Sequence, residues 1–404
     1  MTQVAAPELD ASSALAFRAL LTEPGRRLLD ELRDLAPERE LAAATRLRRD
    51  HPPELVSAAI GQARLRQRAA AKFGAEAERM YFTPDGVEQA TRAPVAEWRA
   101  RRLAALGARR VADLCCGIGG DALALAGAGI EVLAVDRSPL ACAVAEANAA
   151  ALGLSDRVTV RCAAVEDTDV SGHDAVFVDP ARRRTGGGRI FAPEAYSPPL
   201  SWAVALAGRV PHAALKIAPG VPHEAIPAEA EAEWVSHRGE VKEAVLWFGT
   251  GAAHPVRATL LPGGHTLTGR ARPAPAGPPG RYLYEPDGAV IRSHLVADVA
   301  ERVNGRLLDP EIAYITSDEA HPTPFATAYE ITDVLPFHVK RLRALLRERD
   351  VGTVTVKKRG SAVTPETLLK QLKPKGSARA TVFLTRVANA PTMLLARPAT
   401  DPPG

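Results

Sequence analysis

Between residues 110 and 218, short β-branched runs alternate with alanine-rich stretches, and no other feature of the sequence limits the possible folds as strongly. The runs have the length of buried strands, and the stretches between them have helical spacing. We predict strands at residues 110–116, 131–136, 158–163, 175–180 and 212–218, with helices at residues 120–128, 138–152 and 196–208. Such alternation is typical of a parallel, doubly wound sheet, so the sequence predicts an α/β fold.

The length of 404 residues indicates more than one domain, and the pattern changes along the chain. Before the alternating region, apolar residues recur at helical spacing and prolines mark the breaks. After it, a Gly- and Pro-rich stretch without periodicity indicates a linker. We therefore predict a helical region at 1–86, a central α/β domain at 87–262, a linker at 263–281 and a second α/β domain at 282–398.

Two apolar runs close the central domain, at residues 243–249 and 257–262. No long helix separates them, so we predict that they pair as antiparallel strands. Added to the five parallel strands, this pair gives a mostly parallel, seven-stranded sheet.

Composition excludes several classes of protein. Apolar residues make up 46% of the chain, which is enough for a large core. No apolar stretch reaches the roughly 18–20 residues of a membrane span, and the N-terminus lacks the features of a signal peptide. The cysteines, which lack the spacing of zinc sites or disulfide frameworks, are Cys115, Cys116, Cys142 and Cys162. We therefore expect a cytoplasmic protein without a metal site or membrane contact.

The first functional motif joins a predicted strand to a helix in VADLCCGIGGDALALA. Gly117 and Gly119 let the backbone approach a ligand closely, and the following helix directs its N–H groups into the same space. Asp113 suits a ligand with a cationic amino-acid end, whereas it would repel a pyrophosphate. Asp136, at the end of the second strand, can accept hydrogen bonds from two ribose hydroxyls. The glycine spacing also fits a dinucleotide loop, so NAD binding stays open as an alternative.

The second motif lies where the strand AVFVD ends in Asp179 and Pro180. Ligands of open α/β sheets bind at this carboxyl edge. Asp179 can accept a hydrogen bond from an amino group, and Pro180 stiffens the turn so that neighbouring carbonyls stay free as acceptors. An amine held by two acceptors keeps its lone pair directed at the atom it attacks. We therefore predict Asp179 and Pro180 as the catalytic positions.

Cationic residues follow this edge. Arg182 and Arg183 begin a run of four arginines and three glycines, which fits either a flap that binds substrate phosphates or a solvated loop. Lys216, in LKIAPG, would either face the substrate or extend towards solvent.

Asp113 with its glycines, the strand-ending Asp136 and the DPAR edge resemble class I methyltransferases, which use S-adenosylmethionine. More narrowly, the chain resembles a bacterial family of methyltransferases with a helical N-terminus and a C-terminal THUMP-like domain. The segments that carry this resemblance are KFGAEAERMYFTPDGVEQATR (72–92), DPARRRTGGGRIF (179–191), SPPLSW (197–202), LKIAPG (215–220) and YEITDVLPFHVKRLRALLRERDVGTVTVKKRGSAV (329–363). The resemblance implies a Rossmann-like class I fold.

Two departures from the class I pattern bear on the site. Amino-directed nucleic-acid methyltransferases usually end the edge motif in an aromatic residue that stacks on a flipped base, and Arg182 stands there instead. The acid expected to meet the adenine of the cofactor is also missing, because Ala163 and Ala164 occupy its place. We predict that Asp167 makes this contact, with Glu166 as the alternative. No cysteine follows residue 162, which disfavours the covalent chemistry of uracil-C5 enzymes.

Charge is distributed unevenly along the chain. From residue 340 to 386, thirteen lysines and arginines accompany three acids, although the whole chain has a net charge of only +4. Segregated positive charge is an electrostatic signature of phosphate binding, and the resemblance to THUMP domains implies an RNA partner. We predict that Lys357, Lys358 and Arg359 contact the RNA, with a solvated basic surface as the alternative.

Together these observations predict an enzyme that transfers a methyl group from S-adenosylmethionine to a base of tRNA or rRNA. A small-molecule methyltransferase is one alternative, and an RNA-binding protein with an inactive methyltransferase domain is another. An NAD-dependent oxidoreductase is a third.

Overall fold

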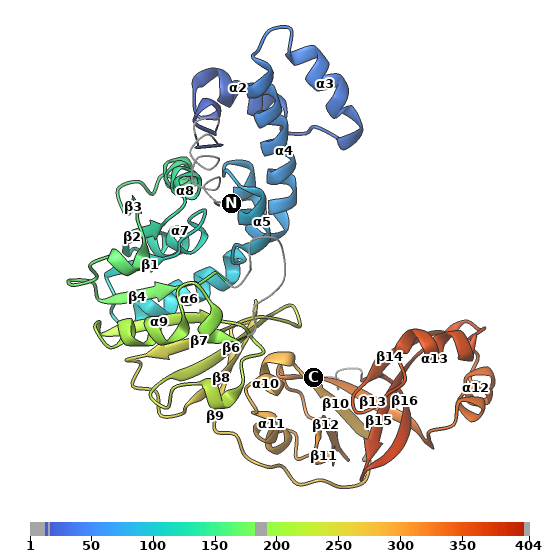
Figure 1. Cartoon of the computed structure of the whole chain (residues 1–404). Helices are drawn as coiled ribbons and strands as arrows, with labels where there is room; N and C mark the ends of the chain where they lie inside the picture. Colours follow the sequence, from blue (N-terminus) through green and yellow to red (C-terminus); the bar gives the residue numbers. More distant parts are fainter. Residues whose placement is uncertain (1–12, 15–16, 182–191, 400–404) are drawn as a thin grey trace, which may run out of the picture. The chain divides into compact units, whose positions relative to one another are not determined.

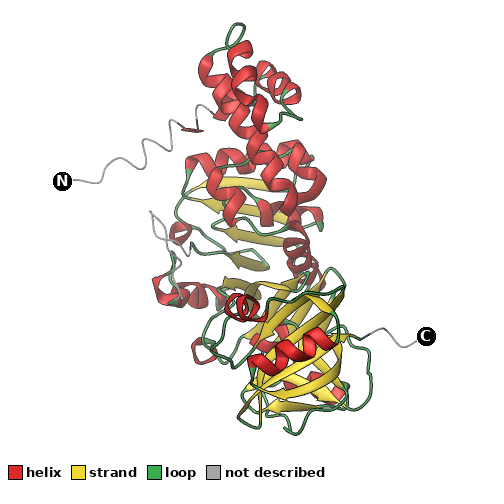
Figure 2. Ribbon diagram, turned by 90° about the vertical axis from the view of Figure 1, so that its right-hand side faces the viewer, coloured by secondary structure: helices red, strands yellow, loops and turns green. Residues whose placement is uncertain are grey.

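The computed structural model describes residues 13–14, 17–181 and 192–399 (Figure 1). The chain divides into two compact units. The first consists of Met1–Ala230 and Ala244–Gly251, and the second of Glu231–Glu243 and Ala252–Gly404. Helices predominate at the start of the first unit, whereas strands predominate in the second (Figure 2).

The predicted helical N-terminus is confirmed. Prolines occupy the first turn of several of its helices, where the missing N–H has no intrahelical partner to lose. Thr22 and Thr83 act as N-caps, because their side chains accept hydrogen bonds from the N–H groups of Gly25 and Gly86. The helices before the sheet are α2 (Glu23–Glu31), α3 (Glu40–Leu47), α4 (Pro53–Phe73), α5 (Pro84–Gln89) and α6 (Ala93–Ala105).

The first unit contains the predicted parallel sheet. Its strands follow the order β3-β2-β1-β4-β5-β7, in which β1 to β5 are parallel and β7 is antiparallel to β5. The strands are β1 (Arg110–Leu114), β2 (Glu131–Asp136), β3 (Val158–Cys162), β4 (Ala175–Val178), β5 (His212–Ile217) and β7 (Glu240–Phe248), of which β7 enters the first unit at Ala244. The doubly wound α/β fold is therefore confirmed, with β1 buried beyond its first residue as helices on both faces of a sheet require.

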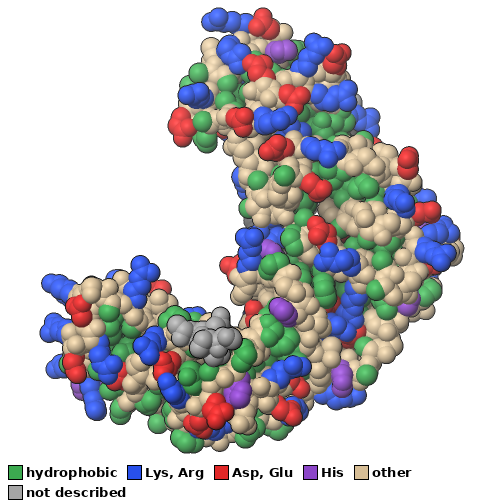
Figure 3. All heavy atoms as spheres, turned by 180° about the vertical axis from the view of Figure 1, so that it is seen from behind, with side chains coloured by type: hydrophobic (Ala, Val, Ile, Leu, Met, Phe, Trp, Pro, Cys, Tyr) green, Lys and Arg blue, Asp and Glu red, His purple; other side chains and the backbone are tan. Residues whose placement is uncertain are grey.

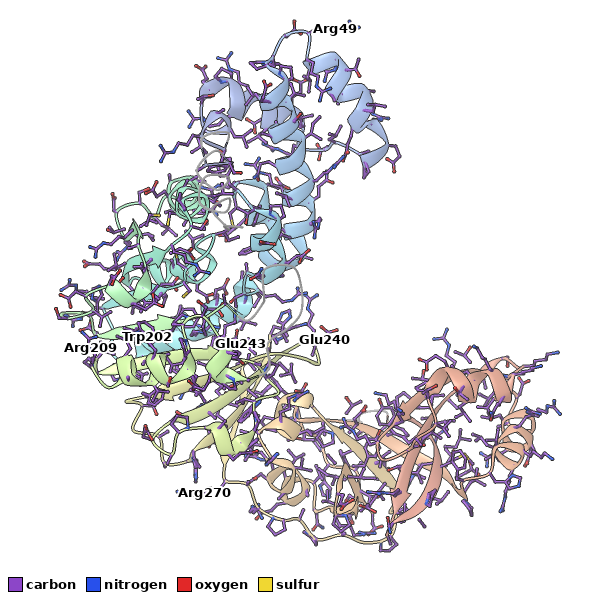
Figure 4. All side chains as sticks on the ribbon, in the orientation of Figure 1. Arg49, Trp202, Arg209, Glu240, Glu243 and Arg270 are labelled. Atoms are coloured by element: carbon purple, nitrogen blue, oxygen red, sulfur yellow. The ribbon has the colours of Figure 1, made fainter. Side chains whose placement is uncertain are left out.

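Helices connect these parallel strands. They are α7 (Gly120–Gly127), α8 (Pro139–Leu152) and α9 (Leu200–Ala207). Figure 4 labels Trp202 on α9 and Arg209 just after it, as well as Glu240 and Glu243 at the beginning of β7.

The N-terminal helices share one hydrophobic core with the sheet. Leu28 of α2 and Val56 of α4 belong to the same buried cluster as Val111 of β1. Asn148 of α8 adds polar contacts, because its side-chain amide donates to the carbonyl of Tyr81 (3.0 Å) and accepts from the N–H of the same residue (2.6 Å). Asn148 and Tyr81 are both buried, so these bonds join the two parts firmly.

The predicted antiparallel pairing of residues 243–249 with 257–262 is wrong. In the second unit, β8 (Val256–Leu261) pairs in parallel with β6 (Glu231–His237) and antiparallel with β9 (His265–Gly269), whereas β7 pairs with β5. With β6, β8 and β9, the sheet has nine strands in the described residues rather than seven. β9 lies within the segment predicted as a linker.

The sequence pattern did not reveal β6, because EAEWVSH carries two acids in a strand that is buried throughout. Both carboxylates have partners on β8. Glu231 accepts a hydrogen bond from Arg257 (2.6 Å), and Glu233 accepts one from Thr259 (2.5 Å). Pairing of this kind makes buried acids tolerable, and only the tertiary structure supplies it.

The rest of the second unit has mixed helices and strands, with a second sheet of its own. Its sheet has the order β11-β12-β10-β13-β16-β15-β14, in which β14 and β15 are parallel. Val382 and Leu384 of β15 pack with the helices α12 and α13, whereas Phe383 packs with Tyr314 and Tyr329 on the other face. The elements are β10 (Tyr282–Pro286), α10 (Gly288–Arg292), α11 (Val296–Arg302), β11 (Arg306–Asp309), β12 (Ile312–Ser317), β13 (Ala326–Pro336), α12 (Val339–Glu348), β14 (Val351–Lys358), α13 (Pro365–Leu372), β15 (Ala378–Val387) and β16 (Ala390–Pro398).

Candidate active site

Asp113 and Asp179 lie at the same edge of the sheet. β1 runs parallel to β4, with Asp113 opposite Phe177. The N–H of Asp179 donates to the carbonyl of Leu114 (3.2 Å). The Gly-rich loop therefore begins beside the residue that ends β4, which is the geometry that a shared cofactor and acceptor site requires.

The loop from β1 to α7 turns sharply. Cys115, Gly117 and Gly119 have φ angles of 67°, 56° and 85°, in the left-handed region that favours glycine. The N–H of Cys115 donates to the carbonyl of Val135 (2.9 Å) and fastens the loop to β2. A Cβ on Gly119 would lie 3.2 Å from that of Ala145, whereas a Cβ on Gly117 would meet nothing within 4 Å. The space beside Gly117 is open, as a ligand that approaches the backbone requires.

Asp113 is an exceptional side chain in this site. Its carboxyl group is fully buried, and neither oxygen accepts a hydrogen bond from any residue that the structure describes. Burial and the nearby carboxylates of Asp121 and Asp179 raise the pKa of Asp113 well above its usual range. A buried carboxyl group without a partner is destabilising, and a cationic ligand atom would relieve this cost.

The carboxylate of Asp136 is held by two backbone groups. Its Oδ2 accepts a hydrogen bond from the N–H of Gly117 (2.9 Å), and its Oδ1 accepts one from the N–H of Ser138 (2.9 Å). Ser138 in turn caps α8 through the N–H of Ala141 (3.1 Å). Each carboxylate oxygen has a further lone pair, so Asp136 is oriented and still able to accept from hydroxyl groups.

Glu166 and Asp167 lie on a short turn, Val165–Asp167, that follows β3. Both side chains are exposed. Burial chiefly raises the pKa of the Cys115 thiol above its usual range, and the nearby carboxylates that add to the rise include Asp136 and Glu166. Both residues of the turn stay candidates for the adenine contact.

At the acceptor edge, Lys216 points towards the site from within the protein. Its Nζ donates to Oδ2 of Asp179 (2.6 Å) and to Oγ1 of Thr91 (2.8 Å). Lys216 is buried, so it does not extend to solvent, and it reaches the acceptor edge through Asp179. Pro180 is also buried, whereas 23% of the Asp179 side chain is exposed. Arg182 and Arg183 lie outside the described residues.

Sequence reasoning missed the polar residues behind Lys216. Thr91 precedes α6 and donates a hydrogen bond from its hydroxyl to Oδ2 of Asp121 on α7 (2.8 Å). Asp121 also forms an ion pair with Arg99 of α6, whose guanidinium lies over the ring of Phe177 at 4.2 Å. Thr91, Asp121 and Arg99 fall in segments whose sequence indicates only helix and loop, so no local pattern could have found them.

The predicted RNA-contact residues differ from one another in their surroundings. Lys357 forms an ion pair with Glu285 of β10 and lies over the ring of Tyr329. Arg359 is 3.9 Å from the same glutamate and stacks over Tyr314. Lys358 is exposed. Two of the three cations are thus already engaged within the domain.

Other cations on this domain are exposed and form no ion pair within the described part of the chain. They lie on α12 and on α13 with the segment after it, where Figure 3 shows Lys and Arg side chains gathered. We call this set the α12–α13 basic face; its members are Lys340, Arg341, Arg347, Lys370, Lys373 and Lys375.

The residues that the structure describes lack two kinds of feature. They contain no group of three or more His, Cys, Asp or Glu residues that could hold a metal ion. They also contain no helix that is long and apolar enough to cross a membrane.

Three family models match the chain. A model described as a methyltransferase domain matches residues 111–179, and one described as THUMP domain-like matches residues 326–398. A domain of unknown function matches residues 13–69. The first match spans the loop of Asp113 and ends at Asp179.

Relatives along nearly the whole chain agree with these matches. A solved structure from Porphyromonas gingivalis W83, described as a methyltransferase, has a TM-score of 0.76 at 23% identity and covers 93% of this chain and 97% of its own, which shows a common fold. An uncharacterized S-adenosylmethionine-dependent methyltransferase of Mycobacterium tuberculosis is 35% identical over 351 residues, which are 84% of this chain and 94% of the relative. With this degree of identity over such a span, the chain belongs to the S-adenosylmethionine-dependent methyltransferases.

Proposed function

We propose that this methyltransferase modifies a base of tRNA or rRNA, and that Asp179 and Pro180 hold the acceptor at the carboxyl edge of the sheet. The observation that carries the acceptor site is the position of Asp179. Its carboxylate is partly exposed beside the loop of Gly117, and one of its oxygens is occupied by Lys216.

S-adenosylmethionine supplies an electrophilic methyl group when it is bound. The chain offers a fitting set of groups for it in Asp113, Gly117, Gly119 and Asp136. The unpartnered carboxyl group of Asp113 suits the ammonium end, and the open space beside Gly117 lets a ligand lie against the backbone. Asp136 is oriented to accept from the ribose hydroxyls. Asp167, with Glu166 as the alternative, would make the adenine contact, since both side chains are exposed on the turn that follows β3.

Methyl transfer then depends on the alignment of the acceptor. Asp179 accepts a hydrogen bond from the amino group that is to be methylated, which keeps the nitrogen lone pair directed away from the carboxylate. Pro180 fixes the turn. Arg182 and Arg183 would contact the phosphates on either side of the base.

RNA is favoured as the substrate by the second unit. Its THUMP-like domain presents the α12–α13 basic face, whose six cations are exposed and form no ion pair among the described residues. Exposed cations on one face can contact the phosphates of a nucleic-acid backbone.

The decisive experiment compares modified nucleosides in total RNA from strains with and without the gene, by mass spectrometry. One methylated nucleoside is expected to disappear on deletion and to reappear when the purified protein and S-adenosylmethionine are added to the RNA. If the nucleosides are identical in both strains, the acceptor is not RNA; a small-molecule acceptor or an inactive domain would then have to be tested.

RNA affinity should depend on the α12–α13 basic face. Neutralising Lys370, Lys373 and Lys375 by glutamine is expected to reduce the slope of log affinity against log salt by about three, because each phosphate contact releases about one counterion. Filter binding of tRNA over a range of salt concentrations measures this slope.

Arg281 and Arg397 provide the matched control for this triple variant. Both are exposed but already paired with Glu330, at 2.9 and 2.6 Å. Their replacement by glutamine should leave the slope nearly unchanged. Equal effects of the two sets would mean that only overall charge matters and that the face is not a binding site.

A further inference from the structure

A buried network of hydrogen-bonded side chains leads from α6 to the acceptor edge. Arg99 pairs with Asp121, which accepts a hydrogen bond from the hydroxyl of Thr91. Thr91 accepts from Lys216, and Lys216 donates to Asp179. The first four of these side chains are buried, and only the last is partly exposed. The network therefore ends at Asp179, the one member that can contact a substrate.

The direction of each hydrogen bond in this network is fixed by the chemistry of the donor and acceptor groups. An ammonium group only donates and a carboxylate only accepts. The hydroxyl of Thr91 has one hydrogen, which it gives to Asp121, so it meets Lys216 with a lone pair. Two of the three N–H groups of Lys216 are thereby assigned, which sets the rotation of the ammonium group about its stem.

The two positive and two negative charges in this network balance one another. Arg99 and Asp121 form one ion pair, and Lys216 and Asp179 form the other. An ion pair this deeply buried is costly to form and costly to break, because desolvation of the charges must be offset by good geometry. The geometry at Lys216 is good, with distances of 2.6 and 2.8 Å to its two oxygen partners.

The consequence for Asp179 is that its two oxygens are no longer equivalent. Oδ2 accepts from Lys216, whereas Oδ1 accepts from none of the residues that the structure describes. We propose that Lys216, aligned by Thr91, is a positioning residue that fixes the Asp179 carboxylate so that Oδ1 meets the amino group to be methylated. This inference rests on the proposed role of Asp179.

A purely structural ion pair would make different predictions. If Lys216 served only to neutralise Asp179, its partner Thr91 would be irrelevant to the rate of methyl transfer. If the pair positions Asp179, loss of the threonine hydroxyl should lower the rate while leaving charge, cofactor affinity and RNA affinity in place.

The test compares Thr91→Val, which keeps the shape and removes the hydroxyl, with Thr91→Ser, which keeps the hydroxyl. The substrate is total RNA from a strain that lacks the gene, and single-turnover transfer of a labelled methyl group is measured. Thr91→Val is expected to slow transfer about tenfold, because misaligned acceptors react slowly. Thr91→Ser should restore at least half of the rate.

Lys216→Met gives a second readout. Without the ammonium group, Oδ2 of Asp179 loses its donor, so transfer should slow at least as much as in Thr91→Val. In both variants the rate at saturating RNA should fall, whereas the RNA concentration that gives half of that rate should change little. Affinity for S-adenosylhomocysteine and the melting temperature are measured for each variant, and Thr91→Val alone suffices if Lys216→Met does not fold.

Asp179→Asn separates failure of this inference from failure of the proposed function. If Asp179→Asn is fully active, the acceptor site itself is wrongly assigned. If Asp179→Asn is inactive while Thr91→Val and Lys216→Met retain the wild-type rate, Asp179 acts without being positioned by Lys216 and the inference is overturned.

Discussion

Replacement of Asp179 by asparagine is expected to slow methyl transfer by about a hundredfold or more, while the affinity for S-adenosylhomocysteine changes little. The side chain keeps its shape but loses its charge, and its amide can present a donor where the acceptor amine needs an oxygen. Loss of one aligned polar group at a reacting atom has an effect of this size in other enzymes. Single-turnover methylation of RNA and calorimetric titration measure the two quantities.

The stability of this variant needs a separate control. Asp179→Asn leaves Lys216 buried without its counter-charge, so its melting temperature should fall. The double variant Asp179→Asn, Lys216→Met removes both charges and should regain much of the lost stability without regaining activity. Recovery of activity in the double variant would show that misfolding, not loss of the acceptor carboxylate, explains the single variant.

Replacement of Asp113 by asparagine is expected to weaken binding of S-adenosylhomocysteine by about a hundredfold, which corresponds to about 3 kcal/mol. The amide has the shape of the carboxyl group but cannot pair with the ammonium end of the ligand. Asp156→Asn, which changes an exposed acid of the same domain, is the control and should bind normally. Equal affinity in the Asp113 variant would remove Asp113 from the cofactor site.

The same substitution should stabilise the free protein at high pH. The pKa of Asp113 is raised by burial in the folded state, from a usual value of 3.8, so the folded chain keeps a proton that the unfolded chain has lost. The stability associated with this proton is present at low pH and decreases as pH rises from the unfolded pKa through the folded one. Asparagine does not titrate, so the melting temperature of Asp113→Asn should exceed that of the wild type increasingly as pH rises.

Proton release gives an independent check of this assignment. A cationic ligand atom beside Asp113 favours the ionised form, so binding of S-adenosylhomocysteine should release a proton wherever the free protein holds one. Calorimetry in buffers of different ionisation enthalpy counts this proton. The release should be absent in Asp113→Asn, and its persistence there would assign it to another group.

The parts of this protein that could be predicted from sequence are those that depend on neighbouring residues. The parallel strands from β1 to β5 are short β-branched runs between helices, and the turn at Gly117 and Gly119 is marked by residues that tolerate left-handed backbone. Because parallel strands end at one edge, the position of Asp113 and Asp179 at the same edge of the sheet also followed from the predicted topology.

The errors have a common physical origin. β6 was missed because its acids, Glu231 and Glu233, accept hydrogen bonds from partners on β8 that lie more than twenty residues away. The role of Lys216 was ambiguous for the same reason, since Thr91 is 125 positions distant in the sequence. Pairing between remote polar residues leaves no periodicity, so it becomes visible only with the tertiary structure.

The shared core of the helices and the sheet has a consequence for how this enzyme can be divided. The bonds between Asn148 and Tyr81, together with the apolar cluster around them, make residues 17–86 part of the catalytic body. A shortened protein that starts at residue 87 would uncover that apolar surface and leave Oδ1 of Asn148 without the N–H of Tyr81. The N-terminal helices and the sheet should therefore fold and unfold as one unit, although different family models match them.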